Sequence, residues 1–155
     1  MKQLLSVLLL CVLSGASFAQ IAGPGLTAET GAGANVGSFV FDCEPLPVTV
    51  SAGETITFDV WGSLNSPFVL LRADSANQCL SLAGFSGALI LDPPFTLVTA
   101  GVLSEVSPCL SCPNAFSSYT VTVPPGFPPM TVELQAVAQG GGTFGFTSAL
   151  AIEVQ

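Results

Sequence analysis

The fold is decided by Thr131–Gln155, TVELQAVAQGGGTFGFTSALAIEVQ, in which apolar and polar residues alternate twice in succession. The first alternation places these side chains on one face: Val132, Leu134, Ala136 and Ala138. After a break at Gly140-Gly141-Gly142, the second places these on one face: Phe146, Ser148, Leu150, Ile152 and Val154. A period of two residues is typical of a strand with one buried face. The stretch therefore predicts two antiparallel strands that close a β-domain, with the polar face of each strand as solvent-facing scaffold. That polar face comprises Thr131, Glu133, Gln135, Val137, Gln139, Thr147, Ala149, Ala151 and Glu153.

Working outward from this pair, shorter strand-like runs separated by Pro and Gly turns extend back through the chain. The runs are 38–42, 48–50, 55–61, 68–71, 87–91, 95–99 and 119–123. In Thr55–Trp61, the apolar side chains of Ile56, Phe58 and Val60 are expected to face inward. Strands at intervals of about 8–12 residues, with no helical periodicity, indicate an all-β fold. We predict an antiparallel β-sandwich of about seven to nine short strands, Ig-like or jelly-roll-like, with a closed barrel as the second choice.

The N-terminus has the pattern of a cleavable export signal. One positive charge at Lys2 precedes the apolar run Leu4–Leu13. Ala16-Ser17-Phe18-Ala19 then offers small residues, Ser17 and Ala19, at the two positions that a signal peptidase reads. We therefore expect a signal peptide over 1–19, with cleavage before Gln20. The next segment, 20–37, is rich in Gly, Ala and Thr and is predicted to be a flexible leader or at most one weak strand. A single domain is expected over 38–155.

Charge excludes several classes of partner. Once Lys2 is removed with the signal, Arg72 is the one basic residue against ten acidic ones, which is a net charge of −9. A single basic side chain cannot neutralise a run of phosphates, so the sequence argues against nucleic-acid binding. Attraction to anionic lipid is disfavoured for the same reason, and no later stretch is long and apolar enough to suggest membrane insertion after cleavage.

Four cysteines remain after cleavage, and an even number in an exported chain favours two disulfides. Three pairings are possible, of which we favour Cys43–Cys79 with Cys109–Cys112. A CxxC motif can also carry redox chemistry, but Pro113 follows this one and no helix pattern or basic neighbour supports a stabilised thiolate. A structural disulfide is the preferred interpretation of Cys109 and Cys112.

The chemistry available to the chain is limited, because it contains no histidine and loses its lysine on processing. Catalytic triads, imidazole metal sites and Schiff bases are thereby excluded. Paired carboxylates could serve a glycosidase, but nothing in the sequence pairs any two of the acids. We predict that the protein is not an enzyme and expect no cofactor.

Two weaker binding hypotheses remain. Trp61 is expected to point outward beside Asp59, and an exposed aromatic ring next to a carboxylate is a common arrangement for stacking on sugars. Oxygen-bearing side chains at Asp74 and Asn77 are weak candidates for calcium, although their spacing matches no known calcium loop.

Three segments together resemble a known kind of domain: SAGETITFDVWGSLNSPFVLLRA, GALILDPPFTLVTAG and TVELQAVAQGGGTFGFTSALAIEV. Their order is similar to a small secreted β-sandwich domain that recurs in exported proteins of planctomycetes. In that pattern Gln135-Ala136 and Thr147-Ser148-Ala149 hold the places of the last two strands. The CxxC loop and the lack of an asparagine after Ser148 depart from it. The resemblance implies export and a β-sandwich, but no activity.

The leading functional hypothesis is a non-enzymatic β-sandwich module, secreted or on the cell surface, with a structural or interaction role. One alternative is a carbohydrate-binding module that uses Trp61. Another is a self-assembling surface subunit whose charge-free edge strands, such as Tyr119–Val123, join copies of the chain. A glycan or a protein at the cell surface is the kind of partner expected.

Overall fold

A computed structural model describes residues 23–109 and 112–155, and all regular secondary structure in these ranges is β-strand. The expected signal peptide and the residues around its cleavage site lie outside the described residues. Within the described ranges, no helix is long and apolar enough to span a bilayer. The strands are β1 (Gly25–Thr30), β2 (Asn35–Ser38), β3 (Leu46–Val50), β4 (Thr55–Gly62), β5 (Pro67–Ala73), β6 (Thr96–Val102), β7 (Glu105–Val106), β8 (Ala115–Thr122), β9 (Met130–Gly140), β10 (Thr143–Phe146) and β11 (Leu150–Val154).

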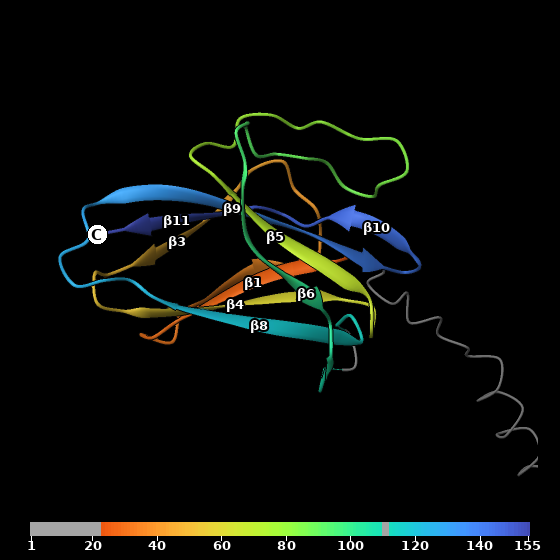
Figure 1. Cartoon of the computed structure of the whole chain (residues 1–155), viewed down its shortest axis with the longest axis horizontal. Helices are drawn as coiled ribbons and strands as arrows, with labels where there is room; N and C mark the ends of the chain where they lie inside the picture. Colours follow the sequence, from red (N-terminus) through yellow and green to blue (C-terminus); the bar gives the residue numbers. More distant parts are fainter. Residues whose placement is uncertain (1–22, 110–111) are drawn as a thin grey trace, which may run out of the picture.

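The strands form two sheets that lie one above the other (Figure 1). Sheet A has the order β2-β1-β4-β8-β7, and sheet B has the order β3-β11-β9-β5-β6, with β10 also paired to β9. The sheets are antiparallel except where β11 pairs with β3 in parallel, so that β11 lies between β3 and β9. The predicted β-sandwich is confirmed, although the described residues form eleven strands rather than seven to nine.

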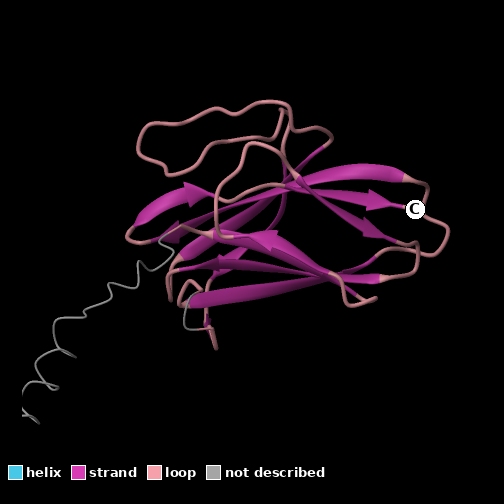
Figure 2. Ribbon diagram, turned by 180° about the vertical axis from the view of Figure 1, so that it is seen from behind, coloured by secondary structure: helices cyan, strands magenta, loops and turns pink. Residues whose placement is uncertain are grey.

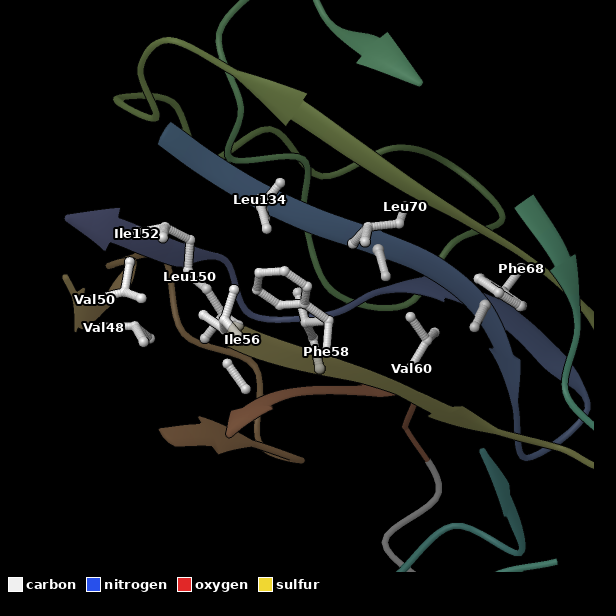
Figure 3. Packing of buried hydrophobic residues seen from close by; sticks show 14 of the residues in the cluster. Val48, Val50, Ile56, Phe58, Val60, Phe68, Leu70, Leu134, Leu150 and Ile152 are labelled. Atoms are coloured by element: carbon white, nitrogen blue, oxygen red, sulfur yellow. The ribbon is translucent and has the colours of Figure 1, made fainter. Parts of the chain in front are cut away.

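The core fills the space between the two sheets (Figure 3). The expected inward residues of β4, Ile56, Phe58 and Val60, are all buried there, opposite Leu134 of β9 and Leu70 of β5. Side chains of this size each contribute roughly 1.5–3 kcal/mol when fully buried. The prediction that β4 alternates between a buried and an outer face is therefore confirmed.

The closing strands pair as expected, but the second one is interrupted. Phe146 of β10 lies opposite Val137, whereas Leu150 of β11 lies opposite Leu134, so the second strand carries one residue more than its partner. This bulge turns the side chain of Phe146 to the outer face of sheet B, beside Val137. Placing Phe146 on the same face as Leu150 was wrong, because one extra residue in a strand reverses the faces that follow it.

The segment 20–37 was expected to be a flexible leader or to hold at most one weak strand, but the part that the structure describes contains two strands. β1 and β2 occupy most of it, and β1 pairs along its whole length with β4. Leu26 and Ala28 are buried in the core, while Thr27 and Glu29 face outward. The strand was missed because only Leu26 and Ala28 give its inward face apolar side chains, which is too short an alternation to identify a strand.

Two further segments that were expected to be strands do not form regular strands. Ser38 ends β2, and residues 39–42 form no strand. In 87–91, the regular pairing is limited to an isolated bridge between Leu89 and Leu80. This second segment belongs to a long loop, residues 74–95, that passes over the outer face of sheet B (Figures 1 and 2). Its apolar run is buried there: Ala88, Ile90 and Leu91.

Candidate functional site

Trp61 lies near the end of β4 on the outer face of sheet A, but its ring is only partly exposed. The indole stacks against Phe116 of β8, with ring centroids 4.8 Å apart, and meets the edge of Phe39 at 5.4 Å. Its Nε1–H donates to the hydroxyl of Thr27 at 3.0 Å. These contacts engage one face of the indole, its edge and its polar atom, and the ring remains partly exposed.

Asp59 lies two residues before Trp61 on the same face, as the sequence predicts. Its carboxylate accepts a hydrogen bond from the hydroxyl of Ser118 at 2.6 Å. Further along the same two strands, hydroxyl groups pair across β4 and β8, at 3.0 Å for Thr57 and Thr120 and at 3.3 Å for Thr55 and Thr122. The outer face between these strands is thus a row of small polar pairs that ends at the aromatic cluster.

The two calcium candidates have different partners. The carboxylate of Asp74 lies 3.8 Å from the guanidinium of Arg72, and the amide of Asn77 donates to Asp92 at 2.7 Å. Asp92 also accepts from the hydroxyl of Ser75 at 2.8 Å, and these two hydrogen bonds lower the pKa of Asp92. The described residues contain no group of three or more carboxylate, thiol or imidazole side chains that could hold a metal ion. Asp92 orders the start of the loop as a hydrogen-bond acceptor.

The favoured disulfide pairing is confirmed: Cys43 is bonded to Cys79, and Cys109 to Cys112. The first bond, with Cα atoms 5.5 Å apart, links the segment that follows β2 to the long loop over sheet B. The second closes the short CxxC loop between β7 and β8. In this oxidised state neither thiol of the CxxC motif is a nucleophile.

Among the described residues, Glu133 is the one acidic residue with a buried side-chain oxygen that lacks a hydrogen-bond partner. Its Oε2 is buried without a hydrogen-bond partner among the described residues. Burial, and secondarily the nearby carboxylate of Glu153, raise the pKa of Glu133. A carboxyl with a raised pKa beside a second carboxylate is a feature of glycosidase sites. Here, however, both groups lie on the outer face of sheet B outside the hollow described next.

An apolar hollow of about 280 Å³ opens at the other end of that outer face, and sequence reasoning missed it. Its lining consists of Pro67, Phe68, Val69, Phe85, Val137 and Phe144. Val69 and Val137 are cross-strand partners on β5 and β9, and the exposed rings of Phe85 and Phe144 come from the loop and from β10. Phe85 and Phe144 remain 41% and 39% exposed, so the hollow presents aromatic surface to solvent. No titratable side chain lines it.

Gln135 fixes the loop that forms one wall of this hollow. It was expected to face solvent, but it is 1% exposed because the loop covers it. Its Oε1 accepts from the backbone N–H of Ile90 at 3.0 Å, and its Nε2 donates to the carbonyls of Ala88 and Thr147, both at 2.8 Å. One side chain therefore connects the covering loop, β9 and the bulge. The apolar run at 87–91, which needs a surface to bury against, was the available signal for this covering layer.

The comparisons with known proteins show no family for this chain. No family model and no curated protein gives a significant match. Among solved structures, the chain is similar to the crystal structure of a cellulose-active polysaccharide monooxygenase from M. thermophila, at 14% sequence identity and a TM-score of 0.35. The alignment covers 71% of this chain and 54% of that one, so the chain spans about half the length of the matched structure.

Proposed function

We propose that the protein is a non-enzymatic, exported β-sandwich module whose role is to bind a partner protein outside the cell. The observation that carries this proposal is the apolar hollow on sheet B. It is rimmed by exposed aromatic rings and lined by no charged side chain. A pocket of this kind holds a large apolar side chain, and such buried anchors dominate the affinity of protein interfaces. The occupant proposed here is an aromatic or branched aliphatic side chain of the partner.

Two further observations support a binding role outside the cell. Both pairs of cysteines that remain after the expected cleavage form disulfides, which persist in oxidising compartments. The carboxylates of Glu133 and Glu153, which interact electrostatically, do not line the hollow. The hollow itself would hold a partner through its shape and its apolar contacts.

Binding of apolar side chains in the hollow is tested by titrating the secreted protein with toluene and indole, which represent the side chains of Phe and Trp. Methyl groups of Val69 and Val137 should show saturable shifts in NMR spectra, because both line the hollow. Val137→Asp should abolish the shifts of the Val69 methyl groups by placing a carboxylate in the hollow. The matched control, Val106→Asp, alters an exposed valine on β7 in the other sheet and should leave them unchanged. Absence of saturable shifts in the unaltered protein would contradict the proposal.

Two results would favour a different function. Turnover of a simple substrate that a single carboxylate substitution abolishes would show that the protein is an enzyme. Binding to a glycan array that is lost in Trp61→Ala, with the fold intact by circular dichroism, would restore the carbohydrate-binding alternative.

A further inference from the structure

β8 has a free edge of unusual composition. The strand pairs along its whole length with β4, but on its other side only Ala115 and Phe116 pair with β7. The hydroxyl of Ser117 then donates to the carbonyl of Val102 at 3.0 Å. From Ser118 to Thr122, no described strand pairs with this side of β8.

The other outer strands of the sandwich each carry a feature that discourages edge pairing. β2 has four residues, β3 contains Pro47, and the pairing of β6 with β5 shifts by a bulge next to Leu70. Short edge strands, proline and bulges are the usual means of preventing strands from adding to a sheet. β8 has none of them: its register with β4 is regular over eight residues, and it contains no proline and no charged residue.

Electrostatic repulsion between acidic surfaces makes this uncharged edge the more favourable place for two copies to meet. Two copies each carry a net charge of −9 after signal removal, so contacts through acidic surfaces repel. The free segment, Ser118-Tyr119-Thr120-Val121-Thr122, contributes no charge to such a contact.

The side chains of the segment are also complementary to themselves. Ser118, Thr120 and Thr122 are exposed on the outer face, whereas Tyr119 and Val121 are half-buried on the inner face. A twofold axis at Thr120 places Ser118 opposite Thr122 and Tyr119 opposite Val121, and keeps each pair on one face. Hydroxyl side chains already pair in this way across β4 and β8, where those of Thr57 and Thr120 lie 3.0 Å apart.

We propose that the free edge of β8 binds the same edge of a second copy in antiparallel orientation, so that sheet A continues across the dimer. This mode of association is strand addition, in which backbone hydrogen bonds supply affinity and the side chains set the register. It uses sheet A, so it does not depend on the apolar hollow of sheet B.

Sedimentation velocity of the secreted protein, from micromolar to millimolar concentration, tests the dimer. The unaltered protein should shift from monomer to dimer, and Thr120→Lys should weaken the dimer at least about tenfold by placing two like charges at the axis. The control Thr49→Lys adds the same charge at an exposed position on β3, another edge strand, and should leave the dimer unchanged. A monomer at every concentration, or a dimer that Thr120→Lys leaves intact, would overturn the proposal.

The register is tested by cross-linking. A Thr120→Cys protein should form an intermolecular disulfide under mild oxidation, since residue 120 meets its own copy at the axis. Ser118→Cys should not, since residue 118 lies opposite residue 122. Efficient linkage of the second variant without the first would overturn the antiparallel register centred on Thr120. Toluene and indole binding in Thr120→Lys should match the unaltered protein, which separates failure of the dimer from failure of the hollow.

Discussion

Gln135 shows how much of the covering layer depends on a single side chain. A buried amide is tolerated only when its polar atoms are paired, and here three backbone groups pair with it. Two of those groups belong to Ala88 and Ile90 in the loop, and the third belongs to Thr147 in the bulge. The side chain thus substitutes for the regular strand pairing that 87–91 lacks.

Replacing this amide should be costly. Gln135→Leu keeps the volume but leaves the N–H of Ile90 and two carbonyls without partners, which predicts a loss of about 2–4 kcal/mol in unfolding free energy. Urea denaturation followed by tryptophan fluorescence measures it. The control Gln139→Leu alters a partly exposed amide on the same strand, and its effect should stay within about 0.5 kcal/mol. Equal effects of the two variants would show that the buried contacts of Gln135 do not matter.

At the scale of elements, the strands with frequent β-branched and aromatic side chains could be predicted from the sequence, and the others could not. The alternation in 55–61 and 131–139 is strong enough to identify β4, β9 and the face that β4 buries. β1 was not predicted because only Leu26 and Ala28 form its apolar inward face, and the bulge before β11 leaves no local sequence signal. Segments 74–95 and 39–45 follow neither sheet, and their place is set by distant contacts such as Gln135 and the Cys43–Cys79 bond.

That disulfide should contribute more stability than the one in the CxxC loop. Its sequence separation is 36 residues against 3, and the entropy of loop closure then predicts about 4 kcal/mol against about 2 kcal/mol. The double variants Cys43→Ser/Cys79→Ser and Cys109→Ser/Cys112→Ser serve as each other's control in denaturant titrations. An equal or smaller loss for the first pair would contradict the loop-closure account.

For the molecule as a whole, the candidate site was less predictable than the fold. Asp59 and Trp61 do share a face, but the depth to which Trp61 is enclosed depends on Phe39 and Phe116, which come from other elements. The hollow combines Phe85, Val137 and Phe144 from three separate segments, and no local pattern marks it.

Acidic side chains have opposite effects on the stability of the fold. Backbone N–H groups of Ser51 and Ala32 lower the pKa of Glu54, whereas burial raises the pKa of Glu133.

The pH dependence of unfolding should separate these effects. A lowered folded-state pKa gives Glu54 a stabilising contribution that is present above its unfolded pKa and lost as pH falls. The raised folded-state pKa of Glu133 has the opposite effect on stability: ionisation of Glu133 in the folded protein opposes folding as pH rises through that pKa.

Glu133→Gln should therefore raise the denaturation midpoint at neutral pH. The gain should shrink on acidification, once Glu133 is protonated in both the folded and the unfolded state. Glu29→Gln, which removes the same charge from an exposed position on β1, is the control. A gain in Glu133→Gln that is independent of pH would contradict this assignment.

The position of β11 has a consequence for the timing of folding during biosynthesis. This strand follows all the others along the chain, yet it lies between β3 and β9 in sheet B. A nascent chain therefore cannot complete that sheet until Val154 has left the ribosome, because β11 is the neighbour of β3 in sheet B among the described strands. Long-range pairing of this kind is slow compared with local structure. The topology itself thus delays the native state of the nascent chain until its last described strand can pair with β3.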